Sequence, residues 1–149
     1  MIEDPDDSLV ELFAREVPEV ASGVVEIRAV ARIPGRRAKV ALYSHDPGVD
    51  ATGACVGVRG SRIQRIVEQL NGERIDLFPW SATPERLIKL ALAPANIREI
   101  RLRPDDHTAL ALVDEEQIAV ALGPEGINRD LASRISGWEI EVAVREDAA

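Results

Sequence analysis

Hydrophobic residues recur along the first half of the chain with two different spacings. In residues 25–31 they alternate with mostly polar neighbours, residues 34–35 are Pro-Gly, and residues 39–43 form a second short apolar run. This pattern predicts two strands joined by a turn. Within residues 61–70 the apolar positions are three or four residues apart, which predicts one buried helix face. Residues 73–77 alternate again and predict a third strand.

The second half repeats this order. Residues 100–102 alternate, residues 104–106 supply a turn, and residues 108–113 return as an apolar strand. Apolar residues at helical spacing then occupy 127–135, and residues 138–142 alternate. Both predicted helices are followed by a glycine, Gly72 and Gly137, as expected at helix C-termini.

A helix is also predicted ahead of each copy. Ser8 and Glu11 are spaced as a capping box, so we expect a helix to start at Ser8. Thr83 followed by Pro84 is the combination typical of an N-cap and a first helical turn, and Pro94 marks the end of that helix.

Each copy carries the motif G-x-x-G directly before the predicted helix at 61–70 or 127–135, and we expect a short helix before the motif as well. The motifs are Gly57-Val58-Arg59-Gly60 and Gly123-Pro124-Glu125-Gly126. A chain of this composition contains roughly 0.7 such motifs by chance, so a single copy carries little information. Two copies in matching surroundings indicate an internal repeat, with the order helix, strand, strand, helix, G-x-x-G, helix, strand.

The repeat predicts an α+β protein of two small domains. We place the first, with its N-terminal helix, at residues 8–82 and the second at 83–144, with flexible ends at 1–7 and 145–149. The 149 residues are 46% hydrophobic and 30% charged, a composition typical of globular proteins.

Charge is distributed unevenly around this repeat. The net charge of −8 disfavours nucleic-acid binding if it is taken as an average. Residues 20–82, however, hold nine basic and six acidic side chains, whereas 1–19 and 83–149 are net acidic. The first copy is therefore the candidate site for a negatively charged ligand.

A G-x-x-G loop at the N-terminus of a helix suits a phosphate ligand. Glycine lets the backbone approach the ligand closely, and the helix N-terminus offers free N–H groups with a partial positive charge. Arg59, Arg62 and Arg65 cluster in and after the first loop, where they are candidates for phosphate contact. Arg62 and Arg65 also fit a second interpretation, as the solvated face opposite Ile63 and Ile66.

Several longer stretches carry a family resemblance. They are residues 16–20, 24–32, 53–62 and 137–140, which read EVPEV, VVEIRAVAR, GACVGVRGSR and GWEI. These stretches resemble the two KH modules of the bacterial NusA family of transcription factors, and the resemblance extends from about residue 9 to 142. It implies two tandem type II KH domains that bind single-stranded RNA in transcription pausing, termination and antitermination, beside RNA polymerase or other transcription factors.

The resemblance implies RNA-binding residues in both loops. They are Gly57, Val58, Arg59, Gly60, Ser61, Arg62 and Arg65 in the first module, and Gly123, Pro124, Glu125, Gly126, Asn128 and Arg129 in the second. The second loop departs from the family, which usually has a basic residue after the first glycine. Pro124 lacks an N–H donor and Glu125 is negative, so we expect this module to bind RNA weakly, or through Asn128 and Arg129 alone.

No residue pattern favours catalysis. A single cysteine, Cys55, excludes an internal disulfide, and with only His45 and His107 besides we expect no metal and no cofactor. The protein is therefore predicted not to be an enzyme.

The chain is predicted to be a cytoplasmic monomer. Its uncharged apolar stretches, such as residues 118–122, are far shorter than the ~18 residues of a membrane span, and its acidic N-terminus does not resemble a secretion signal. Two alternative functions remain: an interaction scaffold whose RNA site has decayed, and a KH protein of ribosome maturation.

Overall fold

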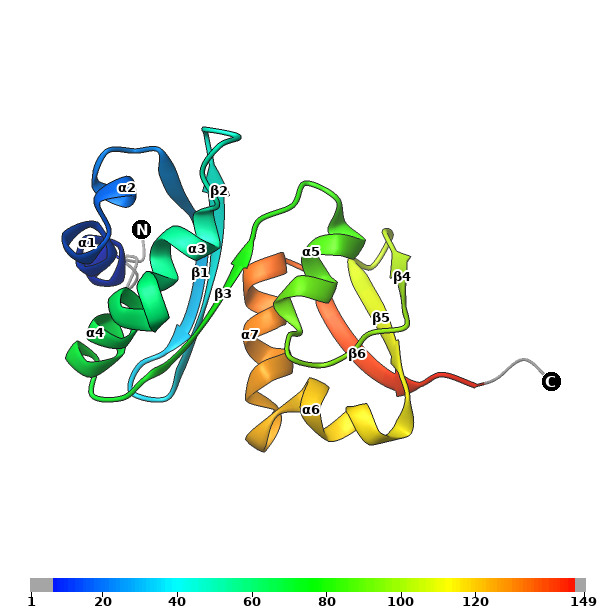
Figure 1. The fold of residues 1–149 in the computed structure, drawn as a ribbon. Helices are drawn as coiled ribbons and strands as arrows, with labels where there is room; N and C mark the ends of the chain where they lie inside the picture. Colours follow the sequence, from blue (N-terminus) through cyan, green and yellow to red (C-terminus); the bar gives the residue numbers. More distant parts are fainter. Residues whose placement is uncertain (1–6, 147–149) are drawn as a thin grey trace. The chain divides into compact units, whose positions relative to one another are not determined.

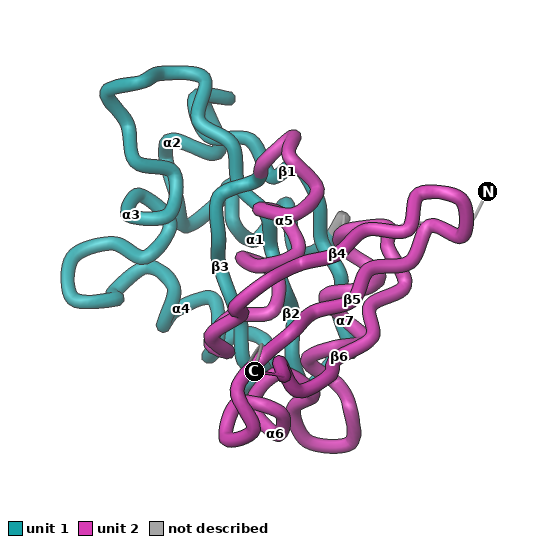
Figure 2. Tube along the Cα trace, turned by 90° about the vertical axis from the view of Figure 1, so that its right-hand side faces the viewer, with its two compact units in different colours: residues 1–80 teal, residues 81–149 magenta. Residues whose placement is uncertain are grey.

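The chain divides into two compact units, residues 1–80 and 81–149 (Figure 2). The computed structural model describes residues 7–146. The predicted flexible ends therefore lie outside the described residues, apart from residue 7, which opens the first helix, and residues 145–146. None of the helices in the described part of the chain has the length and apolar composition needed to cross a bilayer.

Unit 1 has helices on one side of a three-stranded sheet (Figure 1). Its elements are α1 (Asp7–Glu16), α2 (Pro18–Ala21), β1 (Val25–Ile33), β2 (Arg37–Ser44), α3 (Ala51–Val56), a 3-10 turn (Val58–Gly60), α4 (Ser61–Gln69) and β3 (Arg74–Pro79). The central strand β2 pairs antiparallel with β1 and parallel with β3. The parallel pair is possible because α3 and α4 provide the crossover connection.

The core of unit 1 lies between the sheet and the helices. Phe13 of α1, Val40 and Leu42 of β2, Cys55 of α3 and Ile66 of α4 are all fully or almost fully buried and belong to one cluster. Val40 and Leu42 are two residues apart and share a sheet face, as strand geometry requires. The helical periodicity of 61–70 thus reflects burial of α4 against this face.

Unit 2 has the same topology. Its elements are α5 (Pro84–Ala91), β4 (Glu99–Arg103), β5 (Thr108–Val113), a 3-10 turn (Glu115–Gln117), α6 (Ile118–Leu122), a 3-10 turn (Pro124–Gly126), α7 (Ile127–Ser136) and β6 (Glu139–Val144). Strand β5 is central, antiparallel to β4 and parallel to β6. Ile88, Leu131 and Ile140 are fully buried in this unit. The predicted α+β class, with one element order used twice, is confirmed.

Two helix ends differ from the prediction. Helix α1 begins at Asp7, so Ser8 lies inside its first turn. Helix α4 ends at Gln69 rather than beside Gly72, because Asn71 also adopts a left-handed conformation, at φ 58°. Asparagine tolerates this region better than most residues. The other helix, α7, ends at Gly137 as predicted.

A buried ion pair fixes the β1–β2 turn of unit 1. The Glu73 carboxylate is fully buried and accepts two hydrogen bonds from Arg32, at 2.8 and 2.9 Å. It also accepts a hydrogen bond from the backbone N–H of Gly35, at 2.8 Å. One side chain directly before β3 therefore holds both the end of β1 and the turn that follows it.

Candidate nucleic-acid interface

The first G-x-x-G segment forms a tight turn between α3 and α4. Three of its four residues have a positive φ: Gly57 at 77°, Arg59 at 56° and Gly60 at 73°. The N–H of Gly60 donates to the carbonyl of Gly57 at 3.1 Å and closes the turn. The chain thus reverses direction at the N-terminus of α4.

The two glycines of this loop meet different requirements. A Cβ on Gly57 would lie 2.7 Å from Cγ and 3.0 Å from the backbone nitrogen of Arg62. A Cβ on Gly60 would come no closer than 4.0 Å to Ile63. Gly57 is therefore needed for close packing as well as for conformation, whereas Gly60 is needed for conformation alone.

The loop lies on the surface beside a hollow. Val58 is 80% exposed although it is apolar, and Arg59 is exposed as well. The hollow has a volume of about 600 Å³ and is lined by Glu19, Gly53, Ala54, Gly57, Val58, Ser61 and Arg62. An exposed backbone turn next to a concave surface is an arrangement that a nucleotide strand can enter.

Arg62 lines this hollow and forms hydrogen bonds within the protein. Its Nη1 donates to Glu19 Oε1 at 2.9 Å and to the carbonyl of Ala54 at 2.8 Å. The second bond satisfies a carbonyl at the end of α3. Arg62, predicted to contact phosphate, thus also supports the loop from inside the protein. The Arg65 side chain is 70% exposed and lies 4.0 Å from Glu16.

Cys55 lies in the core behind the loop. Burial raises the pKa of its thiol to about 12, and the nearby Glu19 carboxylate raises it further than Arg62 lowers it. A thiol with this pKa stays protonated near neutral pH and is a poor nucleophile. Within residues 7–146 no group of His, Cys, Asp and Glu side chains is placed to hold a metal ion.

The second loop repeats the backbone of the first. Gly123, Glu125 and Gly126 have φ values of 73°, 58° and 77°, and the N–H of Gly126 donates to the carbonyl of Gly123 at 3.1 Å. A Cβ on Gly123 would lie 2.7 Å from the Cβ of Asn128. Asn128 therefore occupies, against Gly123, the place that Arg62 occupies against Gly57.

Asn128 does not meet the expectation of direct RNA contact. It is fully buried, and its Nδ2 donates to the carbonyl of Leu92 at 3.1 Å and to that of Ala121 at 2.9 Å. These bonds join the end of α5, the end of α6 and the start of α7. Asn128 is therefore an internal support of the second loop and presents no surface to a ligand.

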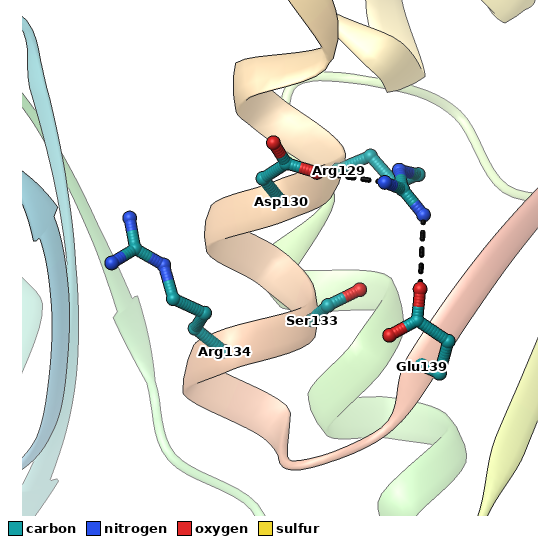
Figure 3. A pocket seen from close by; sticks show the side chains of 5 residues that line it. All are labelled: Arg129, Asp130, Ser133, Arg134 and Glu139. Atoms are coloured by element: carbon teal, nitrogen blue, oxygen red, sulfur yellow. Dashed lines mark hydrogen bonds and ion pairs between the residues drawn. The ribbon is translucent and has the colours of Figure 1, made fainter.

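Arg129 is drawn away from the loop toward β6 (Figure 3). Its guanidinium donates to Asp130 at 2.7 Å, to Glu139 at 3.3 Å and to the carbonyl of Ile140 at 2.9 Å. A pocket of about 280 Å³ lies here, lined by Arg129, Asp130, Ser133, Arg134 and Glu139. Two carboxylates bond to Arg129, which was expected to contact RNA, and this leaves its guanidinium poorly placed for phosphate.

Sequence reasoning missed two parts of the site. Glu19 lines the first hollow from α2 and reaches the loop through an ion pair with Arg62, 43 positions away in the sequence. Leu92 supports the second loop through its carbonyl, 36 positions from Asn128. Neither contact leaves a local pattern in the sequence, because both depend on how separate helices pack.

Comparison with known proteins agrees with this geometry. The family of the NusA-like first KH domain matches residues 4–80, and that of the NusA-like second KH domain matches residues 84–149. The chain is 46% identical over 132 residues to the transcription termination/antitermination protein NusA of Thermus thermophilus, covering 89% of this chain and 34% of that protein. The protein of the same name from Bacillus subtilis is 38% identical over 140 residues, covering 94% and 38%.

The chain thus spans about a third of the length of these curated relatives. Among solved structures, the crystal structure of APE1850 resembles it with a TM-score of 0.63 at 20% identity, over 93% of this chain and 96% of that one. That likeness concerns the fold alone. On the evidence of the two family matches, the chain belongs to the NusA-like KH domains, a first domain followed by a second.

Proposed function

We propose that the chain binds single-stranded RNA through the first loop and serves in the control of transcription elongation. The observation that carries this proposal is the exposed turn at Val58–Gly60, beside the 600 Å³ hollow at the head of α4. Residues 57–65 contain three arginines and no acidic residue. Glu19 and Glu16 face Arg62 and Arg65, so the positive charge that an RNA backbone would meet comes chiefly from the exposed Arg59.

The geometry supports a clamp on the sugar-phosphate backbone. Gly57 and Gly60 carry no side chain that would hold a phosphate away from the turn. The partial positive charge at the N-terminus of α4 favours a phosphate beside the loop, although the N–H of Ser61 is already bonded to the carbonyl of Val58. In KH domains this loop clamps about four nucleotides while their bases lie in the adjoining groove, the place that the hollow takes here.

The relatives support the wider role in this proposal. Proteins named for transcription termination and antitermination share this pair of domains, so we infer work in pausing, termination and antitermination, in the cytoplasm, as a monomer beside RNA polymerase or other transcription factors. The chain would act by binding and not by catalysis. Capture of RNA polymerase from a bacterial lysate on the immobilised chain tests the partner, with the chain denatured by heat as the control.

A protein-interaction scaffold is the second candidate. The net charge of −8 and Glu125 in the second loop favour it. A scaffold would bind RNA no better than other acidic proteins do, and its residual binding would not depend on the first loop.

Replacing Val58 and Arg59 by aspartate separates the two candidates. Aspartate tolerates the left-handed conformation at position 59, and both side chains are exposed, so the fold should persist. We expect RNA affinity to fall at least about tenfold, and the dependence of affinity on salt to become shallower by about 0.7 per lost phosphate contact. The measurement is fluorescence anisotropy of a labelled single-stranded RNA at two salt concentrations.

Arg103→Asp is the matched control, because Arg103 is exposed at the end of β4, outside both loops. The single loop variant Arg59→Asp is measured beside it, because these two substitutions make the same change of charge. Equal losses in the loop variant and in this control would show that net charge alone determines binding, and would favour the scaffold.

A further inference from the structure

The two loops have almost the same shape. Their first glycines have φ values of 77° and 73°, their third residues 56° and 58°, and their last glycines 73° and 77°. Each turn is closed by the same hydrogen bond at 3.1 Å. A difference in ligand binding between the modules must therefore come from the side chains and not from the backbone path.

The charges on the two loops are opposite. From Gly57 to Arg65 the chain carries three arginines and no acid, whereas the equivalent residues 123–131 carry Glu125, Asp130 and a single arginine. Arg62 is bonded to Glu19 and Arg65 lies 4.0 Å from Glu16, so Arg59 is the positive charge of the turn itself, and Glu125 reverses it. That arginine, Arg129, is bonded to Asp130 and Glu139.

Two further differences act in the same direction. The residue equivalent to Arg62 is Asn128, which is neutral and fully buried. Pro124 takes the place of Val58 and has no N–H to donate. The second loop thus keeps the backbone turn of the first, without the positive charge of Arg59 and with one backbone N–H donor fewer.

We propose that Glu125 determines which loop holds RNA: its carboxylate excludes a phosphate from the second loop, so that RNA is held at the first. This inference rests on the proposed function. Glu125 stands where Arg59 stands in the first loop, at φ 58° against 56°. A carboxylate and a phosphate brought together at this turn are like charges in contact, and such a pair is unfavourable.

Glu125→Arg tests the proposal as a gain of binding. Arginine already occupies the equivalent backbone conformation in the first loop, so the substitution should leave the turn intact. Asp105→Arg is the matched control with the same change of charge. Asp105 is exposed in the β4–β5 turn. This turn lies at the C-terminal end of α7, because His107 in the turn stacks on Trp138, which follows that helix, with 4.0 Å between the rings. The second loop lies at the other end of α7, and a helix of this length separates the two by about 15 Å.

Affinity for a labelled 20-nucleotide single-stranded RNA is measured for the wild-type chain and both variants across a salt series. We expect Glu125→Arg to tighten binding about fivefold or more and to steepen the salt dependence by about 0.7, the value for one added phosphate contact. Asp105→Arg should change affinity less than twofold. Equal effects of the two substitutions would overturn the proposal.

The same substitutions in the Val58→Asp, Arg59→Asp background separate this proposal from the proposed function. Glu125→Arg should restore part of the lost binding there, and Asp105→Arg should not. If the wild-type chain fails to bind RNA while Glu125→Arg binds it, the first loop is not a clamp but the role of Glu125 stands. If neither binds, both proposals fail.

Discussion

Gly57 and Gly60 show at the residue scale how one motif combines two physical constraints. We expect Gly57→Ala to destabilise the protein more than Gly60→Ala. Gly57, at φ 77° and ψ 176°, lies in a region open almost only to glycine, and its Cβ would press on the backbone of Arg62. Gly60 is in the left-handed helical region with open space around it, so alanine there should cost about 1–2 kcal/mol.

Urea unfolding of the two variants measures this difference directly. The free energy of unfolding should fall at least about twice as much for Gly57→Ala as for Gly60→Ala. Equal losses would mean that Arg62 moves aside at little cost and that close packing is not what position 57 requires.

Cys55 provides a second test at this scale. Its thiol has a pKa of about 12 because it is buried, so almost none of it is thiolate at pH 8. We expect the native chain to resist alkylation by iodoacetamide at pH 8 and the urea-unfolded chain to react within minutes, as followed by mass spectrometry. Rapid modification of the native chain would show that the core behind the loop opens readily.

The limits of sequence analysis at this scale are clearest at Arg62 and Asn128. The G-x-x-G spacing was enough to predict two turns at the heads of helices. It does not show that the residue two positions after each motif packs against the first glycine, and so Asn128 was expected on the surface. Whether a polar side chain supports the loop or faces a ligand depends on carbonyls from other helices, here those of Ala54, Leu92 and Ala121.

At the scale of elements, hydrophobic spacing predicted the strands and the helix after each loop, α4 and α7. The short helices before the loops, α3 and α6, were expected from the order of the repeat, and α2 was not predicted. Spacing predicted neither the exact ends of the helices nor the contacts between residues far apart in the sequence. Helix α4 stops early because Asn71 takes a left-handed conformation ahead of Gly72, and a glycine pattern does not reveal which of two adjacent residues does so. The ion pair of Arg32 with Glu73 joins residues 41 positions apart, and no local sequence pattern predicts it.

That ion pair predicts a large effect of a single substitution. We expect Glu73→Ala to lower the free energy of unfolding by about 3–5 kcal/mol, because it leaves the largely buried Arg32 guanidinium without its carboxylate. It also removes the acceptor for the Gly35 N–H. Glu68→Ala, on the exposed face of α4, is the control and should cost less than about 1 kcal/mol. A similar small cost for Glu73→Ala in urea unfolding would show that the pair contributes little.

At the scale of the whole molecule, the chain is a repeat whose two copies share a topology and differ in charge. Residues 20–82 are net basic and residues 83–149 are net acidic, and the opposite signs reach the loops themselves. The duplicated pattern was sufficient to predict the fold. The sequence alone does not show that the two loops have the same backbone. Because they do, Arg59 and Glu125 occupy equivalent positions, and the loops differ there in charge.

The most direct measurement of the central claim is an NMR titration of the isotope-labelled chain with a single-stranded RNA. The backbone amide signals of residues 53–65 should shift most, since the loop, the end of α3 and the start of α4 line the hollow. Those of residues 119–131, which surround the equivalent second loop, should shift little. Larger shifts around the second loop than around the first, or none near Gly57–Gly60, would contradict the account.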